Sequence, residues 1–257
     1  MEEKNPIQSA ERIFKILELL ADKGDMGLLE LSQELNLNKS TVHRMLSSLI
    51  YMGYAKQNED TQKYSLSFKL VTLAGQLLER TNILPIARPY LEELSLLSGE
   101  TVHLVQREGN HILYIDKVES TTGSIRMVSH VGMVHPMYCS GVGKAIMSTM
   151  TEEEIIQIWN ESIIEKKTEH TITDFEEFKE VLANIRKQGY ALDNEENELG
   201  VRCIAACIYD YHKNVKYAFS ISGPTNRMTT EHVEQLSQDV LAVQKKLSSA
   251  LGYRYNK

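Results

Sequence analysis

The chain has no long apolar run and few cysteines. No stretch of its 257 residues approaches the roughly 18 consecutive apolar residues of a membrane span, and the polar start MEEKNPIQSAER does not resemble a secretory signal peptide. We therefore expect no membrane partner and a cytoplasmic protein. The odd set of three cysteines, Cys139, Cys203 and Cys207, has no disulfide-framework spacing, which is typical of a reducing compartment.

Acidic residues are also missing from one segment, Leu35 to Gln57. The whole chain is acidic, with 28 Lys and Arg against 35 Asp and Glu, yet this segment carries only positive charges, on Lys39, Arg44 and Lys56. A polyanion such as DNA can approach the chain here more easily than elsewhere.

The stretch from Leu28 to Gly53 predicts two short amphipathic helices joined by a polar turn. Leu28, Leu31 and Leu35 form the apolar stripe of the first. In the second, Asn38 is placed to accept the first free amides, and the predicted buried face consists of Val42, Met45, Leu46, Leu49 and Ile50. The other side carries groups that read base edges or hold phosphates, namely Lys39, Ser40, Thr41, His43, Arg44 and Ser47.

The flanking segments complete a recognisable domain. A helix is predicted from Ser9 to about Lys23, and two short strands, 54–57 with Lys56 and 63–66, surround a polar turn after the helix pair. This order predicts a winged helix-turn-helix over residues 1–66 whose second helix enters the major groove of double-stranded DNA. The alternatives are an ordinary helical hairpin with a solvated polar face, or a scaffold that uses this domain for protein contacts.

Residues 67–82 predict an apolar-rich linker helix. It has more apolar surface than a lone linker needs, so it either packs on both neighbouring domains or pairs with its copy in another subunit. Pairing suits a DNA-binding protein that reads two half-sites.

Residues 83–257 predict an antiparallel α+β domain that binds an effector and forms oligomers. Period-two runs indicate strands at 101–107, 111–118, 125–129, 190–193, 202–209 and 215–222, and helices are expected at 83–98, 140–150, 152–159, 174–188 and 230–251.

Two of these strands each have a face of small residues. Alternation places Cys203, Ala205 and Cys207 together on one strand, and Ala218, Ser220 and Ser222 together on the other. If the two faces adjoin, they leave room for a small molecule with hydroxyl and thiol groups to hold it. The alternative is a half-solvated sheet face or tight helix packing.

The segment Ser140-Gly141-Val142-Gly143-Lys144-Ala145 opens a helix whose free amides can bind a carboxylate or phosphate. It is not a P-loop, because Tyr138 stands where the first Walker A glycine is needed and Ala145 where Ser or Thr is needed. The segment that most resembles a nucleotide-binding motif therefore does not support nucleotide hydrolysis.

Metal and hydrolase sites find little support. An acidic cluster, Asp193, Glu195, Glu196 and Glu198, has His135 with Cys139, or Cys203 with Cys207, as candidate metal partners, but no zinc-site spacing recurs. A cysteine hydrolase built on Cys203, His135 and Asp193 lacks any family signature. We expect no metal, no cofactor and no enzyme activity.

Several motifs, in order along the chain, resemble the IclR family of bacterial transcriptional regulators. They are Ser9-Ala10-Glu11-Arg12, Lys39-Ser40-Thr41-Val42-His43-Arg44, Gly99-Glu100-Thr101-Val102-His103-Leu104, the 140–145 segment, Asp193-Asn194-Glu195-Glu196 with 200–206, and Ile221-Ser222-Gly223-Pro224. The resemblance implies a winged helix-turn-helix and a GAF-like effector domain, assembled as dimers or tetramers. It also implies effector contacts from Met127, Gly141, Val142, Asp193, Cys203, Ser220 and Ser222. Val142 replaces a residue that is commonly smaller, which narrows the expected pocket.

The sequence thus predicts a ligand-responsive transcriptional regulator. We expect a repressor of a catabolic operon, with two recognition helices on a palindromic operator and control by a small carboxylate, an oxo acid or a sugar acid. The alternative is an enzyme that converts a small molecule and carries an accessory DNA-binding head.

Overall fold

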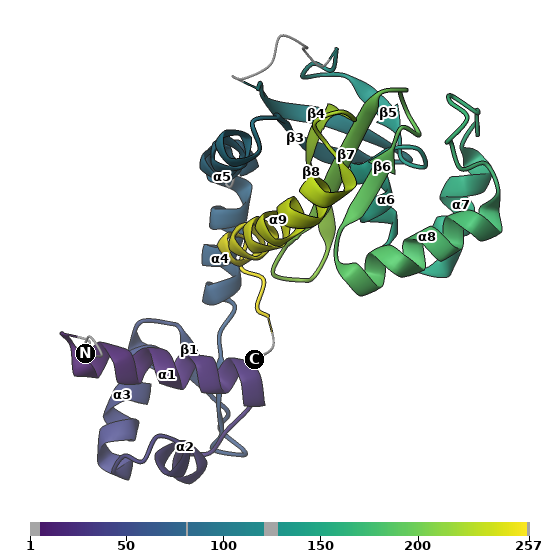
Figure 1. Ribbon diagram of the computed structural model, residues 1–257. Coiled ribbons are helices and arrows are strands. Elements are labelled where there is room, and N and C mark those ends of the chain that lie inside the picture. Colours follow the sequence, from purple (N-terminus) through teal and green to yellow (C-terminus); the bar gives the residue numbers. More distant parts are fainter. Residues whose placement is uncertain (1–5, 81, 121–127, 256–257) are drawn as a thin grey trace. The chain divides into compact units, whose positions relative to one another are not determined.

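The computed structural model describes residues 6–80, 82–120 and 128–255. The chain divides into two compact units, Met1–Thr81 and Asn82–Lys257 (Figure 1). None of the described helices is long and apolar enough to cross a membrane.

The first unit is a winged helix-turn-helix followed by one more helix. Its elements are α1 (Gln8–Lys23), α2 (Leu28–Glu34), α3 (Lys39–Tyr51), the antiparallel strands β1 (Ala55–Gln57) and β2 (Tyr64–Leu66), and α4 (Lys69–Arg80). Its core is built from the predicted apolar stripes, including Ile16, Leu20, Leu31, Val42, Leu46 and Leu49. The predicted order of helix, helix pair and hairpin is confirmed.

Three local expectations for the first unit are wrong. Asn38 is the N-cap of α3, but its side chain makes no capping hydrogen bond. Ile50 is 38% exposed, because it lies at the edge of the apolar stripe rather than within it. The first helix begins at Gln8, one residue before the expected start at Ser9, and Ile7 is its N-cap. In α4, Val71 and Leu73 are exposed apolar side chains.

The second unit contains a six-stranded antiparallel sheet in the order β5-β4-β3-β8-β7-β6. Its elements, in chain order, are α5 (Ile83–Ser98), β3 (Thr101–Glu108), β4 (His111–Val118), β5 (Val134–Pro136), α6 (Gly141–Met147), α7 (Glu152–Glu161), α8 (Phe175–Gln188), β6 (Ala191–Asn194), β7 (Val201–Tyr209), β8 (Val215–Pro224) and α9 (Thr230–Ala250). The predicted α+β class with an antiparallel sheet is confirmed.

One predicted strand, 125–129, lies mostly outside the described residues. Its residues 125–127 lie outside the described ranges, and Val128 and Ser129 are not in a strand. The edge strand of the sheet is β5, which pairs with the start of β4.

Helices cover both faces of this sheet (Figure 1). On one face, α5 and α9 bury apolar side chains against strand residues such as Leu104, Ile204 and Phe219. On the other face, α6 packs against smaller strand residues, among them Ala205 and Ala218, and α7 and α8 contribute to the same apolar cluster. The small-residue faces of β7 and β8 therefore point toward α6.

Candidate ligand cavity and DNA-binding surface

A cavity of about 220 Å³ lies in the second unit, on the face of the sheet that α6 covers. It brings together all the predicted effector residues that the structure describes: Gly141, Val142, Asp193, Cys203, Ser220 and Ser222. The seventh, Met127, lies outside the described residues. The other lining residues are His103, Tyr114, Val128, Ser129, Met133, His135, Ser140, Asn197, Glu198 and Val201.

Strand register explains why the cavity is there. Cys203 pairs with Ser222 and Ala205 with Ser220, so the small-residue faces that the alternation predicts on β7 and β8 adjoin. Side chains of this size do not fill the space under the helix layer, which leaves room that larger residues would occupy. The hydroxyl oxygens of Ser220 and Ser222 lie 3.4 Å apart and are both buried.

The start of α6 forms another wall of the cavity. The Ser140 hydroxyl caps the helix by accepting a hydrogen bond of 3.1 Å from the Gly143 amide. Gly143 lies against the Met137 backbone so closely that a Cβ there would come within 2.2 Å of the Met137 carbonyl oxygen. This contact keeps the first turn in place, and with it the amides of Gly141 and Val142, which have no acceptor within the helix.

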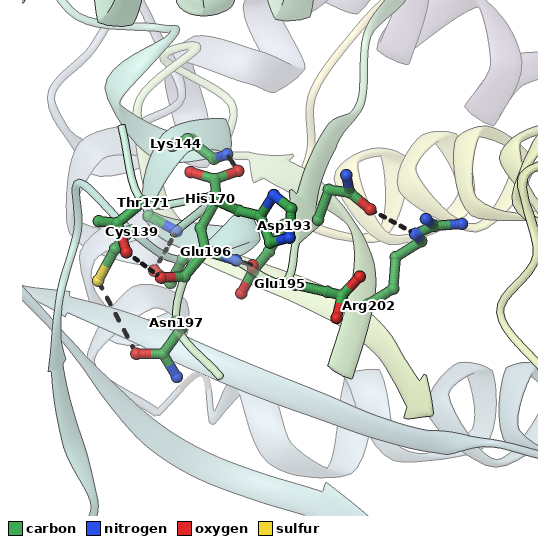
Figure 2. A network of polar contacts seen from close by, with 12 residues as sticks. Cys139, Lys144, His170, Thr171, Asp193, Glu195, Glu196, Asn197 and Arg202 are labelled. Atoms are coloured by element: carbon green, nitrogen blue, oxygen red, sulfur yellow. Dashed lines mark hydrogen bonds and ion pairs between the residues drawn. The ribbon is translucent and has the colours of Figure 1, made fainter. Parts of the chain in front are cut away.

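Asp193 is the buried acid of the site. It is only 5% exposed, and its Oδ1 accepts a 2.9 Å hydrogen bond from the Glu196 amide (Figure 2). Burial raises its pKa to about 7, although the ammonium of Lys144 acts in the opposite direction. Lys144 itself forms a buried ion pair with Glu196.

The loop that follows Asp193 is anchored by side chains from other segments. Glu195 has a left-handed backbone with φ of 63°, and its carbonyl accepts a 2.6 Å bond from Thr168. The Thr171 hydroxyl donates to the Glu196 carbonyl at 2.6 Å, and the Cys139 thiol lies 3.8 Å from Asn197 Oδ1 (Figure 2). These bonds fix the acidic loop beside the cavity.

Two histidines and a tyrosine line the cavity although the sequence did not assign them to the effector site. His103 lies 2.7 Å from Ser129 Oγ through Nε2 and 3.3 Å from Ser222 Oγ through Nδ1. Tyr114 makes edge contacts with the rings of His103 and His135, at centroid distances of 5.1 and 5.8 Å. Burial lowers the pKa of His103 to about 3 and also lowers that of His135, so both rings are neutral near pH 7.

The site is not suited to catalysis by the Cys203 thiol. Cys203, His135 and Asp193 do surround the same cavity. However, burial raises the pKa of the Cys203 thiol far above its usual range, so no thiolate is available as a nucleophile. Among the described residues, no three His, Cys, Asp or Glu side chains gather in a way that holds a metal ion.

The second helix of the helix-turn-helix presents the predicted DNA contacts. On α3 the exposed ones are Lys39, Ser40, His43, Arg44 and Ser47, and on β1 Lys56 is exposed. Thr41, also on α3, is half-buried. Ser47 donates a 2.9 Å hydrogen bond to the His43 carbonyl, which occupies its hydroxyl proton. Within the described part of the chain, neither Lys39 nor Arg44 has an acidic partner, so both charges remain available to phosphate.

Comparison with known proteins decides the family. The model of the IclR C-terminal domain of bacterial transcriptional regulators matches residues 75–249, and the IclR helix-turn-helix domain matches residues 9–59. The chain belongs to the IclR family. This IclR-family chain is a DNA-binding regulator of transcription and not an enzyme, because its relatives are transcriptional regulators.

Three similar proteins illustrate the relationship. The transcriptional regulator KdgR of Escherichia coli K12 is 35% identical over 247 residues, which cover 96% of this chain and 94% of KdgR. The acetate operon repressor of Salmonella typhimurium LT2 is 34% identical over 249 residues, covering 96% and 90%. The crystal structure of Thermotoga maritima IclR superimposes with a TM-score of 0.65 at 33% identity, covering 95% of this chain and 99% of that one.

Proposed function

We propose that this IclR-family chain represses a catabolic operon and that a small carboxylate, an oxo acid or a sugar acid, controls its binding to DNA. The cavity carries the proposal: six expected effector residues from α6, β6, β7 and β8 line one cavity in the unit that lacks the DNA-binding helix. A similar protein is named as the acetate operon repressor, and acetate is a small carboxylate.

The recognition helix supports the DNA half of the proposal. Lys39 and Arg44 are exposed on α3 and Lys56 on β1, so one unit offers only a few positive charges to phosphates in an otherwise acidic chain. One copy should therefore bind DNA weakly, and we propose that two copies, as a dimer or within a tetramer, read a palindromic operator. Because chromosomal DNA is its target, we place the protein in the cytoplasm.

Control by a ligand requires a difference in affinity. A carboxylate in the cavity can change operator binding only if it binds one arrangement of the assembly more tightly than the other. The cavity walls come from segments that are far apart in the sequence, so a ligand that draws them together can bias such an arrangement.

The DNA half is tested by titrating duplexes that the protein selects from a random pool. Arg44→Ala should weaken binding by about 1–3 kcal/mol. Lys245→Ala, which removes an exposed positive charge from α9 in the second unit, is the control and should leave affinity unchanged. Equal affinity of Arg44→Ala and the wild type would remove Arg44 from the interface.

The effector half is tested by thermal-shift screening of the full chain against oxo acids, sugar acids and their neutral amides. A compound that binds the folded state must raise its melting temperature. The same compound should release or strengthen the DNA complex, and Ser220→Ala should reduce that response while DNA binding without ligand stays intact. A normal response in Ser220→Ala would place the effector away from this serine.

A further inference from the structure

The cavity is acidic, although the ligand that we propose is an anion. Among its described lining residues none is Lys or Arg, whereas Asp193 and Glu198 are both acids. The two lining histidines do not compensate, because burial and nearby positive charges lower their pKa values and keep them neutral. A carboxylate that entered the cavity would meet a second carboxylate and no cationic lining group.

The lysines that act on the ionisable groups of the cavity are already engaged. Lys144, on α6, is 1% exposed and forms its ion pair with Glu196, of which the second oxygen, Oε2, is buried without a partner. Lys167 donates to Asn197 Oδ1 at 3.0 Å. Lys117, on β4 beside His103, donates to the Ser129 carbonyl at 2.8 Å.

Besides Glu196, whose charge is paired with Lys144, and the lining acid Glu198, the ionisable groups around Asp193 carry no charge near neutral pH. They are Cys203 on β7, Tyr114 on β4 and Cys139 before α6, and burial raises the pKa of each. His103 on β3 and His135 on β5 are neutral as well. Apart from the backbone amides at the start of α6, the proton on Asp193 is therefore what can offset the charge of an arriving anion from within the described site.

We propose that the cavity binds its carboxylate ligand together with one proton, which stays on Asp193 so that this side chain donates a hydrogen bond to the ligand. The inference rests on the proposed function, because it takes the ligand to be a carboxylate. The ligand and Asp193 then share a single negative charge instead of two, and the donor forms a stronger hydrogen bond to an anionic oxygen than to the neutral carbonyl oxygen of an amide. No covalent bond forms or breaks, and the proton comes from solvent or is already on Asp193.

The proton is available at physiological pH. The same burial that makes a charged Asp193 costly raises its pKa to about 7, so part of the unliganded protein already carries it. Binding should be almost independent of pH below this value. Above it, each pH unit should weaken binding about tenfold, because the proton must be taken up from solution.

The test is isothermal titration of the full chain with pyruvate, 2-oxobutyrate and gluconate between pH 6 and pH 9. Titrations at pH 8.5 in EPPS and in Tris, which differ in ionisation enthalpy, count the protons that accompany the ligand. We expect close to one proton per bound carboxylate at pH 8.5 and close to none at pH 6. The amides of the same acids should bind more weakly at pH 6.

Two variants separate the role of Asp193 from a general effect of charge. Asp193→Asn keeps a neutral hydrogen-bond donor at the same place, so it should bind the carboxylate at pH 8.5 at least as tightly as the wild type and take up no proton. Glu198→Gln removes the other lining acid, which is exposed, so the pH slope should remain. Thermal melting checks that each variant is folded.

The outcomes are distinct. Binding of carboxylates that is independent of pH, without proton uptake, would overturn this inference and leave the proposed function standing. Loss of carboxylate binding in a folded Asp193→Asn protein would also overturn it, because it would show that the charged form is needed. No binding of any carboxylate at any pH would overturn both.

Discussion

The ammonium of Lys144 and the carboxylate of Glu196, 52 positions apart in the sequence, form an ion pair inside the second unit, where neither side chain is more than 7% exposed. The pair joins α6 to the loop that follows β6, the two segments that frame one side of the cavity. Removing a charge from water is costly, so each of these buried charges depends on its partner to offset that cost.

We predict that Glu196→Ala destabilises the second unit by about 3–5 kcal/mol, because it leaves the Lys144 charge buried and unpaired. Replacing both partners, as in Lys144→Met with Glu196→Leu, should recover most of that loss. Urea unfolding followed by the fluorescence of Trp159 measures the free energy of unfolding of the second unit. Trp159 is the single tryptophan of the chain and packs in this unit against Phe175 and Phe178.

The matched control is an exposed ion pair in the same unit. Glu176 and Lys179 pair at 2.8 Å on α8, where solvent screens the interaction. Glu176→Ala should leave the urea midpoint almost unchanged. A similar loss in Glu176→Ala and Glu196→Ala would contradict a special contribution from burial.

A second prediction compares two glycines in one helical turn. A Cβ at Gly143 would lie 2.2 Å from the Met137 carbonyl oxygen and 2.4 Å from its Cα, which are backbone atoms that cannot rotate away. A Cβ at Gly141 would lie 3.4 Å from Ala205 Cβ, an ordinary contact. Gly143→Ala should therefore destabilise the unit by about 1–3 kcal/mol or more, whereas Gly141→Ala should melt close to the wild type.

Ligand binding provides the second readout of this pair. Gly141 lines the cavity, so Gly141→Ala should change the affinity for the effector without a loss of stability. Equal melting temperatures for the two alanine variants would show that the turn can move away from Met137.

The sequence alone predicts those features of the fold and the cavity that depend on a local pattern of residues. Alternation in β7 and β8 places Cys203 and Ser220 on faces of small residues, and these faces adjoin in the structure. The apolar stripes of α1 to α3 likewise predict the core of the first unit, with Ile50 as an exception at the end of its helix. Such patterns repeat every two or 3.6 residues, so they can be read without knowing what lies across from them.

The contributions of His103 and Tyr114 to the cavity could not be predicted in this way. His103 meets Ser222 across 119 positions of sequence because β3 pairs with β8, and no periodicity within β3 specifies that neighbour. The short strand β5 was missed for a related reason: its three residues include Pro136 and show no alternation, and its pairing with β4 alone defines it. The raised pKa of Asp193 could not be predicted either, because it depends on the elements that bury this side chain.

The last prediction concerns pH and stability. The pKa of Asp193 is raised by burial from 3.8 to about 7 in the folded chain, so between about pH 4 and pH 7 the folded state holds a proton that the unfolded state has released. Stability from this group therefore falls as pH rises through that range and stays low above it. Asp193→Asn cannot ionise, so at pH 8 it should be more stable than the wild type, by an amount on the order of a few kcal/mol. Urea midpoints at pH 4.5, 6 and 8 test this, because other titrating groups cancel in the difference between the two proteins. The advantage of Asp193→Asn should shrink steadily toward pH 4.5, and an advantage of the same size at all three pH values would contradict a buried, proton-holding Asp193.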